Sequence, residues 1–166
     1  MVWLILGGAR SGKTTRGLAI AGAFAPHTYI ATAEARDDEM RDRIARHRAE
    51  RGSDWTTREV PLDLCSALSE ADGPGRGILV DCLTLWLSNL MEAGRPLEDE
   101  TRALVQTLSG LSANVVLVSN EVGFGIVPAN ALARAFRDAQ GRLNQAVAAA
   151  AHHVELMVAG LPLKIK

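Results

Sequence analysis

The residues best suited to chemistry lie in one glycine-rich segment, Gly7–Thr14, whose sequence is GGARSGKT. The spacing Gly-x-x-x-x-Gly-Lys-Thr is that of a phosphate-binding P-loop. The segment stands between the apolar run Val2–Leu6 and an expected helix over Thr14–Ala23, as this motif requires. Glycines let the backbone curl until successive N–H groups point at phosphate oxygens, and the following helix adds the positive end of its dipole. An ordinary glycine-rich turn is the alternative, but the spacing predicts that the chain binds a nucleoside triphosphate.

The P-loop motif gives its residues separate roles. Lys13 is expected to reach the β- and γ-phosphates as a catalytic residue, and Thr14 is expected to ligate Mg²⁺. The predicted nucleotide-binding residues of this loop are Gly7, Gly8, Ala9, Arg10, Ser11, Gly12, Lys13 and Thr14.

An acidic residue at the end of a second apolar run completes the predicted phosphate site. The run Ile78–Val80 leads directly to Asp81. In P-loop enzymes a carboxylate at the tip of such a strand holds Mg²⁺ opposite the hydroxyl of the loop, so Asp81 is predicted to bind metal together with Thr14. Capping of a helix that begins at Leu83 is the alternative. The guanine-reading string Asn-Lys-x-Asp is missing, because Asn120–Gly123 has Glu in place of Lys, which disfavours a switch-type GTPase.

Apolar, β-rich runs alternate with segments of helical length along the chain. Strands are expected over Val2–Leu6, Thr28–Thr32, Gly77–Cys82, Asn114–Ser119 and Val154–Ala159. Helices are expected over Thr14–Ala23, Arg36–Arg51, Leu62–Glu70, Leu83–Ala93, Leu97–Ser109 and Ala129–Ala151. Continuous Ile, Leu and Val in the strands is typical of a parallel sheet covered by helices on both faces. We predict a single α/β domain over residues 1–166, with a P-loop (RecA-like) three-layer fold and a mostly parallel sheet, to which Leu163–Lys166 could add an edge strand.

The composition narrows the class of protein. The 166 residues are 48% hydrophobic and carry a net charge of −1, which argues against a protein built mainly to bind nucleic acid. No apolar run approaches membrane-spanning length, and the chain starts with a strand and not with a charged and apolar leader. Cys65 and Cys82 are too few for a disulfide framework or a zinc site, so we expect reduced thiols and a cytoplasmic protein.

One histidine lies in an unusually charged segment. Asp37–Glu39 opens the expected helix Arg36–Arg51, and arginines fill its later turns. Helical spacing places Ile44 and His47 on one narrow apolar seam. Neighbouring cations would keep the imidazole neutral, and therefore nucleophilic, near pH 7. Spacing alone favours a half-buried packing histidine, with a nucleophile as the alternative.

Several blocks of the sequence occur together in one known family. They are Gly7–Thr14, Tyr29-Ile30-Ala31-Thr32-Ala33, Asp37-Asp38-Glu39-Met40, Arg43-Ile44, His47, Trp55-x-Thr57-x-Glu59, Asp81-Cys82-Leu83-Thr84, Val118–Pro128 and Phe136-Arg137-Asp138-x-x-Gly141-Arg142-x-Asn144-Gln145. This set covers essentially the whole chain. It resembles the bifunctional adenosylcobinamide kinase / adenosylcobinamide-phosphate guanylyltransferase of cobalamin biosynthesis.

The resemblance implies two reactions. A nucleoside triphosphate, GTP or ATP, phosphorylates adenosylcobinamide, and GMP is then transferred from GTP to adenosylcobinamide phosphate, giving adenosylcobinamide-GDP and pyrophosphate. The second step uses a covalent GMP–histidine intermediate in this family, and His47 is the matching position. The resemblance further implies a homo-oligomer, a trimer, with sites near subunit borders. The guanine nucleotide contacts that it implies are Ala31, Thr32, Ala33, Arg48, Ala49, Glu50, Arg51, Glu59 and Asp81.

The sequence leaves two alternative functions and one unassigned catalytic role. A plain P-loop kinase for a small molecule or nucleoside would lack the covalent histidine, and a RecA-like nucleotide-driven binding module would show salt-dependent DNA binding. The general base of the kinase step is open. Glu121, just beyond the strand Asn114–Ser119, is a candidate, with a cap of a loop or helix as its alternative role.

Overall fold

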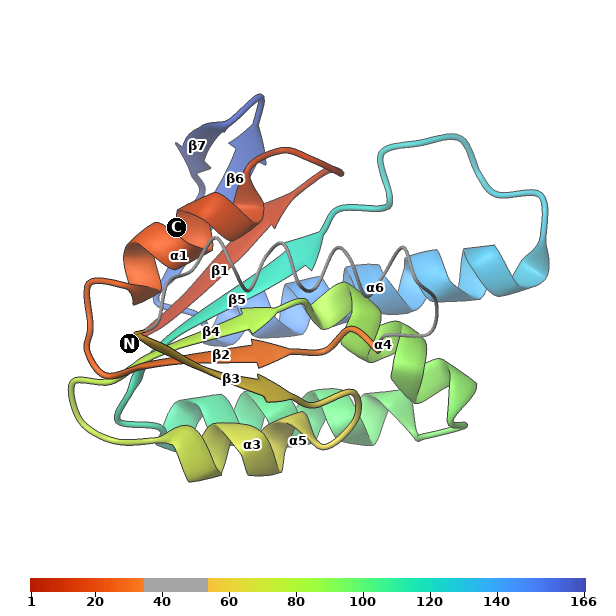
Figure 1. Ribbon diagram of the computed structural model, residues 1–166. Helices are drawn as coiled ribbons and strands as arrows, with labels where there is room; N and C mark the ends of the chain where they lie inside the picture. The colour runs from red at the N-terminus through yellow and green to blue at the C-terminus, as the bar shows by residue number, and fades with distance from the viewer. Residues whose placement is uncertain (35–53) are drawn as a thin grey trace.

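A computed structural model describes residues 1–34 and 54–166 of the chain. Its elements are β1 (Val2–Gly7), α1 (Lys13–Ala21), β2 (His27–Ala31), β3 (Trp55–Glu59), α3 (Leu64–Ala71), β4 (Gly77–Asp81), α4 (Leu83–Glu92), α5 (Leu97–Gly110), β5 (Asn114–Asn120), α6 (Ala131–Ala150), β6 (His153–Val158) and β7 (Leu161–Lys164) (Figure 1). The strands form one sheet in the order β3-β2-β4-β5-β1-β6-β7. All neighbouring strands pair in parallel except β6 and β7.

The predicted α/β fold with a mostly parallel sheet is confirmed. All five predicted strands are present, as β1, β2, β4, β5 and β6. β3 was not expected as a strand, because its sequence WTTRE has no apolar run, and none of its residues is fully buried. Among the described strands it pairs only with β2 and stands at one edge of the sheet, where burial on both faces is not required.

The sheet separates two apolar layers. Alternate strand residues such as Ile78 and Val80 face a large cluster shared with α3, α4, α5 and α6. Leu79, between them, faces the smaller cluster beneath α1 (Figure 1). At Gly17 this helix lies so close to the sheet that a Cβ atom would stand 2.8 Å from Leu79 Cδ1. Close packing of α1 fixes the end of the P-loop relative to the sheet.

The carboxyl ends of the parallel strands share one edge of the sheet. Glu59, Ala31, Asp81 and Val118 are register partners across β3, β2, β4 and β5. The P-loop leaves β1 at the same edge, and β5 lies between β1 and β4. Ligands of open parallel sheets bind outside this edge, where the fold places the P-loop, Ala31, Glu59 and Asp81.

The structure also bears on membrane-spanning segments and on the two cysteines. Among the described residues, no helix has both the length and the apolar character that crossing a membrane would need. Cys65 and Cys82 are not joined in a disulfide. Burial raises the pKa of the Cys82 thiol to about 11, so this cysteine stays protonated at neutral pH.

Candidate active site

The P-loop, residues 7–14, wraps tightly because of its glycines. Gly7 has φ 152°, and a Cβ atom there would stand 2.6 Å from Ser11 Oγ and 2.8 Å from the Met157 carbonyl oxygen. Gly12, with φ 95°, is the residue before α1. The Gly160 N–H donates to the Ser11 carbonyl at 3.1 Å, which ties the loop to the turn between β6 and β7. The loop is therefore shaped by the protein itself before any phosphate arrives.

Lys13 lies inside this loop. The residue is only 7% exposed, and its Nζ donates to the Gly8 carbonyl and to Ser11 Oγ. Burial lowers the pKa of Lys13 from 10.5, and the negative charge of Asp81 partly opposes this effect. An ammonium group held at the centre of a P-loop is positioned to stabilise charge on the β- and γ-phosphates of a triphosphate.

Asp81 faces the P-loop and not the helix that follows it. Its Oδ2 accepts hydrogen bonds from Thr14 Oγ1 at 2.9 Å and from Tyr29 Oη at 2.8 Å. α4 begins after Cys82, and no described side chain caps it. The capping alternative for Asp81 is therefore wrong. The two residues predicted as metal ligands are hydrogen-bonded to each other, although they lie 67 positions apart.

The donor set of this pair fits Mg²⁺. This ion prefers oxygen ligands, and proteins commonly hold it through one or two side chains together with substrate phosphates. Thr14 and Asp81 offer a hydroxyl and a carboxylate at the entrance of the phosphate loop. No cluster of three or more His, Cys, Asp or Glu suited to a metal occurs in the described part of the chain. A metal at Thr14 and Asp81 would therefore depend on oxygens of the bound nucleotide.

Tyr29 is a site residue that the sequence did not reveal. An aromatic residue in an apolar strand is normally read as core, and Tyr29 is indeed 5% exposed. Its hydroxyl reaches Asp81 because β2 pairs directly with β4, so that Ala31 is the register partner of Asp81. Only the strand order, which crosses from β2 to β4, could have predicted this contact.

The end of β2 is tied to its neighbours by buried hydrogen bonds. Thr32 Oγ1 donates to the Cys82 carbonyl at 2.7 Å and accepts from the Cys82 N–H at 2.8 Å. Asn89 Nδ2 donates to the Thr32 carbonyl at 2.8 Å and to the Pro61 carbonyl at 3.0 Å. Ala33, the next residue of the chain, is half-buried. Thr32 is fully buried, and its side chain, its N–H and its carbonyl are all hydrogen-bonded within the protein, so its polar groups serve the fold.

The other predicted contacts fall into two groups. Glu59 ends β3 at the same edge of the sheet and is exposed. The remaining predicted residues lie outside the described residues; they are His47, Arg48, Ala49, Glu50 and Arg51.

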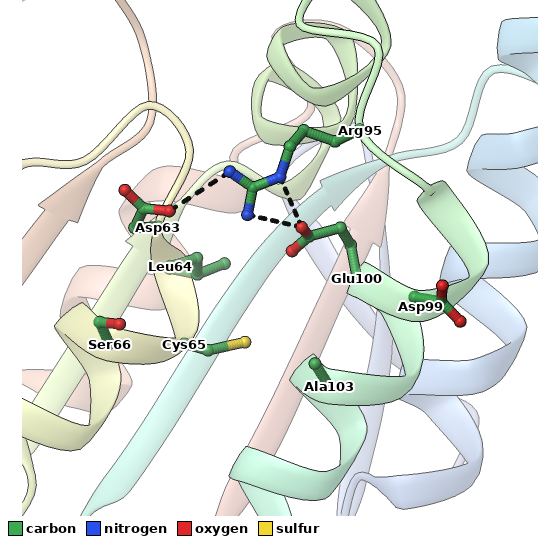
Figure 2. A pocket seen from close by; sticks show the side chains of 8 residues that line it. All are labelled: Asp63, Leu64, Cys65, Ser66, Arg95, Asp99, Glu100 and Ala103. Carbon is green, nitrogen blue, oxygen red and sulfur yellow. Dashed lines mark hydrogen bonds and ion pairs between the residues drawn. The ribbon is translucent and has the colours of Figure 1, made fainter.

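A separate pocket lies between α3 and α5 (Figure 2). It has a volume of about 320 Å³ and contains none of the predicted site residues. Arg95 crosses it, paired with Glu100 at 2.6 Å and with Asp63 at 3.6 Å. Burial raises the pKa of the Cys65 thiol on its wall, which keeps that sulfur protonated at neutral pH. We assign this pocket no role in the chemistry.

A P-loop that faces the Asp81 carboxylate across a parallel sheet defines a P-loop nucleotide-binding protein of the α/β class. Residues 3–165 match the family described as cobinamide kinase / cobinamide phosphate guanyltransferase. The match spans nearly the whole chain. The chain belongs to this enzyme family, which confirms the resemblance drawn from the sequence blocks.

Curated relatives agree with this assignment. The bifunctional adenosylcobalamin biosynthesis protein CobP of Pseudomonas aeruginosa is 48% identical over 167 aligned positions, covering 98% of this chain and 96% of that protein. Proteins named bifunctional adenosylcobalamin biosynthesis protein CobU, from Salmonella typhimurium and Escherichia coli, are 41% and 39% identical over the full length of both chains. A kinase and a guanyltransferase both take the transferred group from a nucleotide, which agrees with the P-loop.

Proposed function

We propose that this protein phosphorylates adenosylcobinamide with a nucleoside triphosphate and then transfers GMP from GTP to adenosylcobinamide phosphate, giving adenosylcobinamide-GDP and pyrophosphate. The observation that carries the proposal is the contact of Thr14 with Asp81 beside a buried Lys13, in a chain of the cobinamide kinase / cobinamide phosphate guanyltransferase family. Both reactions consume a triphosphate, so one P-loop would serve them in turn.

In the kinase step the P-loop holds the triphosphate for in-line attack by the substrate hydroxyl. Backbone N–H groups of residues 7–14 bind the phosphates, and Lys13 stabilises the charge that develops on the β- and γ-phosphates. Thr14 and Asp81 are the residues that would hold Mg²⁺, which supplies further charge neutralisation when bound. Catalysis of phosphoryl transfer is mostly positioning and electrostatics, and these residues supply both.

In the guanylyl step we propose His47 as the nucleophile. A neutral imidazole nitrogen attacks the α-phosphorus of GTP, the bond to the bridging oxygen breaks, and pyrophosphate leaves. An oxygen of adenosylcobinamide phosphate then attacks the GMP–histidine intermediate and releases the imidazole. The resemblance to the family supports this assignment. The same resemblance supports guanine nucleotide contacts from Ala31, Thr32, Ala33, Arg48, Ala49, Glu50, Arg51, Glu59 and Asp81.

We further propose a cytoplasmic homo-oligomer, a trimer, built from one domain over residues 1–166. Exposed apolar side chains support association. Phe124 and Ile126 in the connection between β5 and α6 are 81% and 97% exposed, and Leu161 on β7 is 71% exposed. Large apolar side chains that are exposed on one subunit are candidates for burial between subunits. Light scattering of the purified protein would give a trimeric mass, and a monomeric mass at all concentrations would contradict this assembly.

The direct test of the proposed function is product analysis. The protein is incubated with adenosylcobinamide, GTP and Mg²⁺, and the corrinoids are separated and identified by mass spectrometry. We expect adenosylcobinamide phosphate first and adenosylcobinamide-GDP later, with pyrophosphate released. Phosphate transfer without any GDP adduct would reduce the protein to a plain kinase. Absence of both products from a folded, nucleotide-binding protein would overturn the proposal.

A further inference from the structure

The end of β5 is held from three sides next to the P-loop. The Asn120 N–H donates to Thr84 Oγ1 of α4 at 2.8 Å. The Glu121 N–H donates to the Gly7 carbonyl, at the start of the P-loop, at 3.1 Å. Asn144 of α6 donates through Nδ2 to the Asn120 carbonyl at 3.1 Å and to Glu121 Oε1 at 3.3 Å. The backbone and carboxylate of Glu121 are therefore fixed relative to the phosphate loop.

The orientation of the Asn144 amide follows from its surroundings. Its Oδ1 accepts from Ser119 Oγ at 2.6 Å and from Gln140 Nε2 at 2.9 Å. A flipped amide would place Oδ1 against the Asn120 carbonyl and the Glu121 carboxylate, which are both acceptors. The donor side of Asn144 must therefore face Glu121.

Gln140 supports this orientation from the buried side of the network. Gln140 is fully buried, and its Nε2 also donates to Ser119 Oγ at 2.9 Å. Its Oε1 has no hydrogen-bond partner among the described residues. The acceptor side of Asn144 is thus held by Ser119 and Gln140, which keeps its donor side directed at Glu121.

We propose that Glu121 accepts the proton of the substrate hydroxyl in the kinase step and that Asn144 is the positioning residue that aims its carboxylate. This inference rests on the proposed function. Glu121 directly follows β5, the strand between β1 with its P-loop and β4 with Asp81, and it is half-buried. As the substrate hydroxyl passes its proton to Glu121, the hydroxyl oxygen forms a bond to the γ-phosphorus. The bond from that phosphorus to the bridging oxygen breaks, and the nucleoside diphosphate leaves.

The two proposed reactions differ in their need for a base. A substrate hydroxyl must lose a proton when it attacks phosphorus, whereas a neutral imidazole and a phosphate oxygen attack with free lone pairs. Guanylyl transfer therefore serves as an internal control. A general structural defect near the P-loop would slow both reactions, while a defect in proton transfer would slow only the kinase.

The test measures both reactions in Glu121→Gln, Asn144→Asp and Gln145→Glu, the last being a matched amide-to-acid change at an exposed neighbour on α6. We expect the kinase kcat to fall about 10²-fold in Glu121→Gln and roughly tenfold in Asn144→Asp, which replaces a donor by a second carboxylate. Nucleotide KM and guanylyl transfer should stay within about twofold, and Gln145→Glu should match the unaltered protein in both assays.

Several results would overturn the inference while leaving the proposed function intact. They are an unchanged kinase kcat in Glu121→Gln, an unchanged kinase kcat in Asn144→Asp, or a parallel loss of both reactions in Glu121→Gln. If Asn144→Asp loses both activities, the positioning role is tested with Ser119→Ala, which removes one donor to the Asn144 oxygen. This variant should slow the kinase reaction and leave guanylyl transfer unchanged. An unchanged kinase rate, or an equal loss of both reactions, would reject the positioning role. An unaltered protein that makes no phosphorylated corrinoid would instead reject the proposed function itself.

Discussion

The carboxyl edge of the sheet has two halves that are built differently. Around β1, β5 and β4, side chains meet one another across long sequence separations, as in the contact of Thr14 with Asp81. Around β2 and β3, buried polar groups such as Thr32 and Asn89 tie backbone segments together, and Glu59 is exposed. The half around β1, β5 and β4, which contains the P-loop, is here called the phosphate half. Its side chains are positioned by contacts within the fold. In the other half the buried polar groups are used by the fold, and Glu59 is an exposed carboxylate that we propose for contact with the guanine nucleotide.

Lys13→Met should have the largest effect, because it removes the cation from the phosphate half. We expect the rate of the kinase step to fall by about 10²-fold or more, with a loss in guanylyl transfer as well. Steady-state kinetics of both reactions would measure this. Lys164→Met, at an exposed lysine of β7, is the matched control and should be silent. Normal activity of Lys13→Met in both assays would place triphosphate chemistry elsewhere.

Asp81→Asn should come next, since it keeps the shape of the side chain but removes its charge. Activity should fall about 10- to 100-fold, and part of it should return at higher Mg²⁺ concentration if Asp81 holds the metal. Tyr29→Phe keeps the carboxylate and removes one hydrogen bond to it, so its loss should be smaller. A loss in Asp81→Asn that does not respond to Mg²⁺ would argue for a purely structural carboxylate.

Glu59→Gln tests the half of the carboxyl edge around β2 and β3. If Glu59 contacts the guanine nucleotide, the affinity for GTP should fall roughly tenfold while the affinity for ATP changes little. Calorimetric titrations with both nucleotides would show the split, and Glu98→Gln, at an exposed position of α5, is the control. Equal weakening of both nucleotides would mean that this half does not distinguish bases.

The smallest expected effect is on stability and not on chemistry. Arg16 of α1 forms two hydrogen bonds with Glu155 of β6, at 2.7 and 2.8 Å. Glu155→Gln should lower the free energy of unfolding by about 1 kcal/mol at neutral pH, as measured by urea denaturation. Asp138→Asn, which breaks an exposed contact with Arg137, is the control and should change little.

The pH dependence of this pair has a definite sign. The ion pair with Arg16 lowers the pKa of Glu155 below its ordinary value of 4.5. Its stabilisation is therefore complete above that pH and is lost as the pH falls through the lowered pKa of the folded protein. The difference between Glu155→Gln and the unaltered protein should shrink in that acidic range. A difference that is constant with pH would exclude an ionic origin.

The sequence predicted the elements that follow local rules and missed those that depend on the sheet as a whole. Apolar runs identified β1, β2, β4, β5 and β6, and P-loop spacing identified Lys13 and Thr14. β3 was not predicted, because an edge strand needs little apolar sequence. The edge strand expected over residues 163–166 lies at Leu161–Lys164, because positive φ angles at Ala159 and Gly160 turn the chain back onto β6 earlier.

Contacts across the sheet were equally hidden from the sequence. Tyr29 reaches Asp81 through a strand order that does not follow the chain. Asn144 of α6 reaches Glu121, the residue after β5, through the packing of this helix beside the end of the strand. The sequence offered Asp81 two roles, as metal ligand or helix cap. Only its hydrogen bonds to the P-loop threonine and to Tyr29 excluded the cap.

The central claim is that one P-loop protein performs kinase chemistry and also carries GMP on His47. Incubation of the protein with GTP labelled at the α-phosphate, followed by denaturing electrophoresis, tests it most directly. We expect label on the unaltered protein that survives base and is lost in acid, as in a phosphoramidate, with no label retained from the γ-phosphate. His47→Ala should take up none. A folded His47→Ala protein that still acquires the α-label, or an unaltered protein that never does, would show that His47 does not carry GMP.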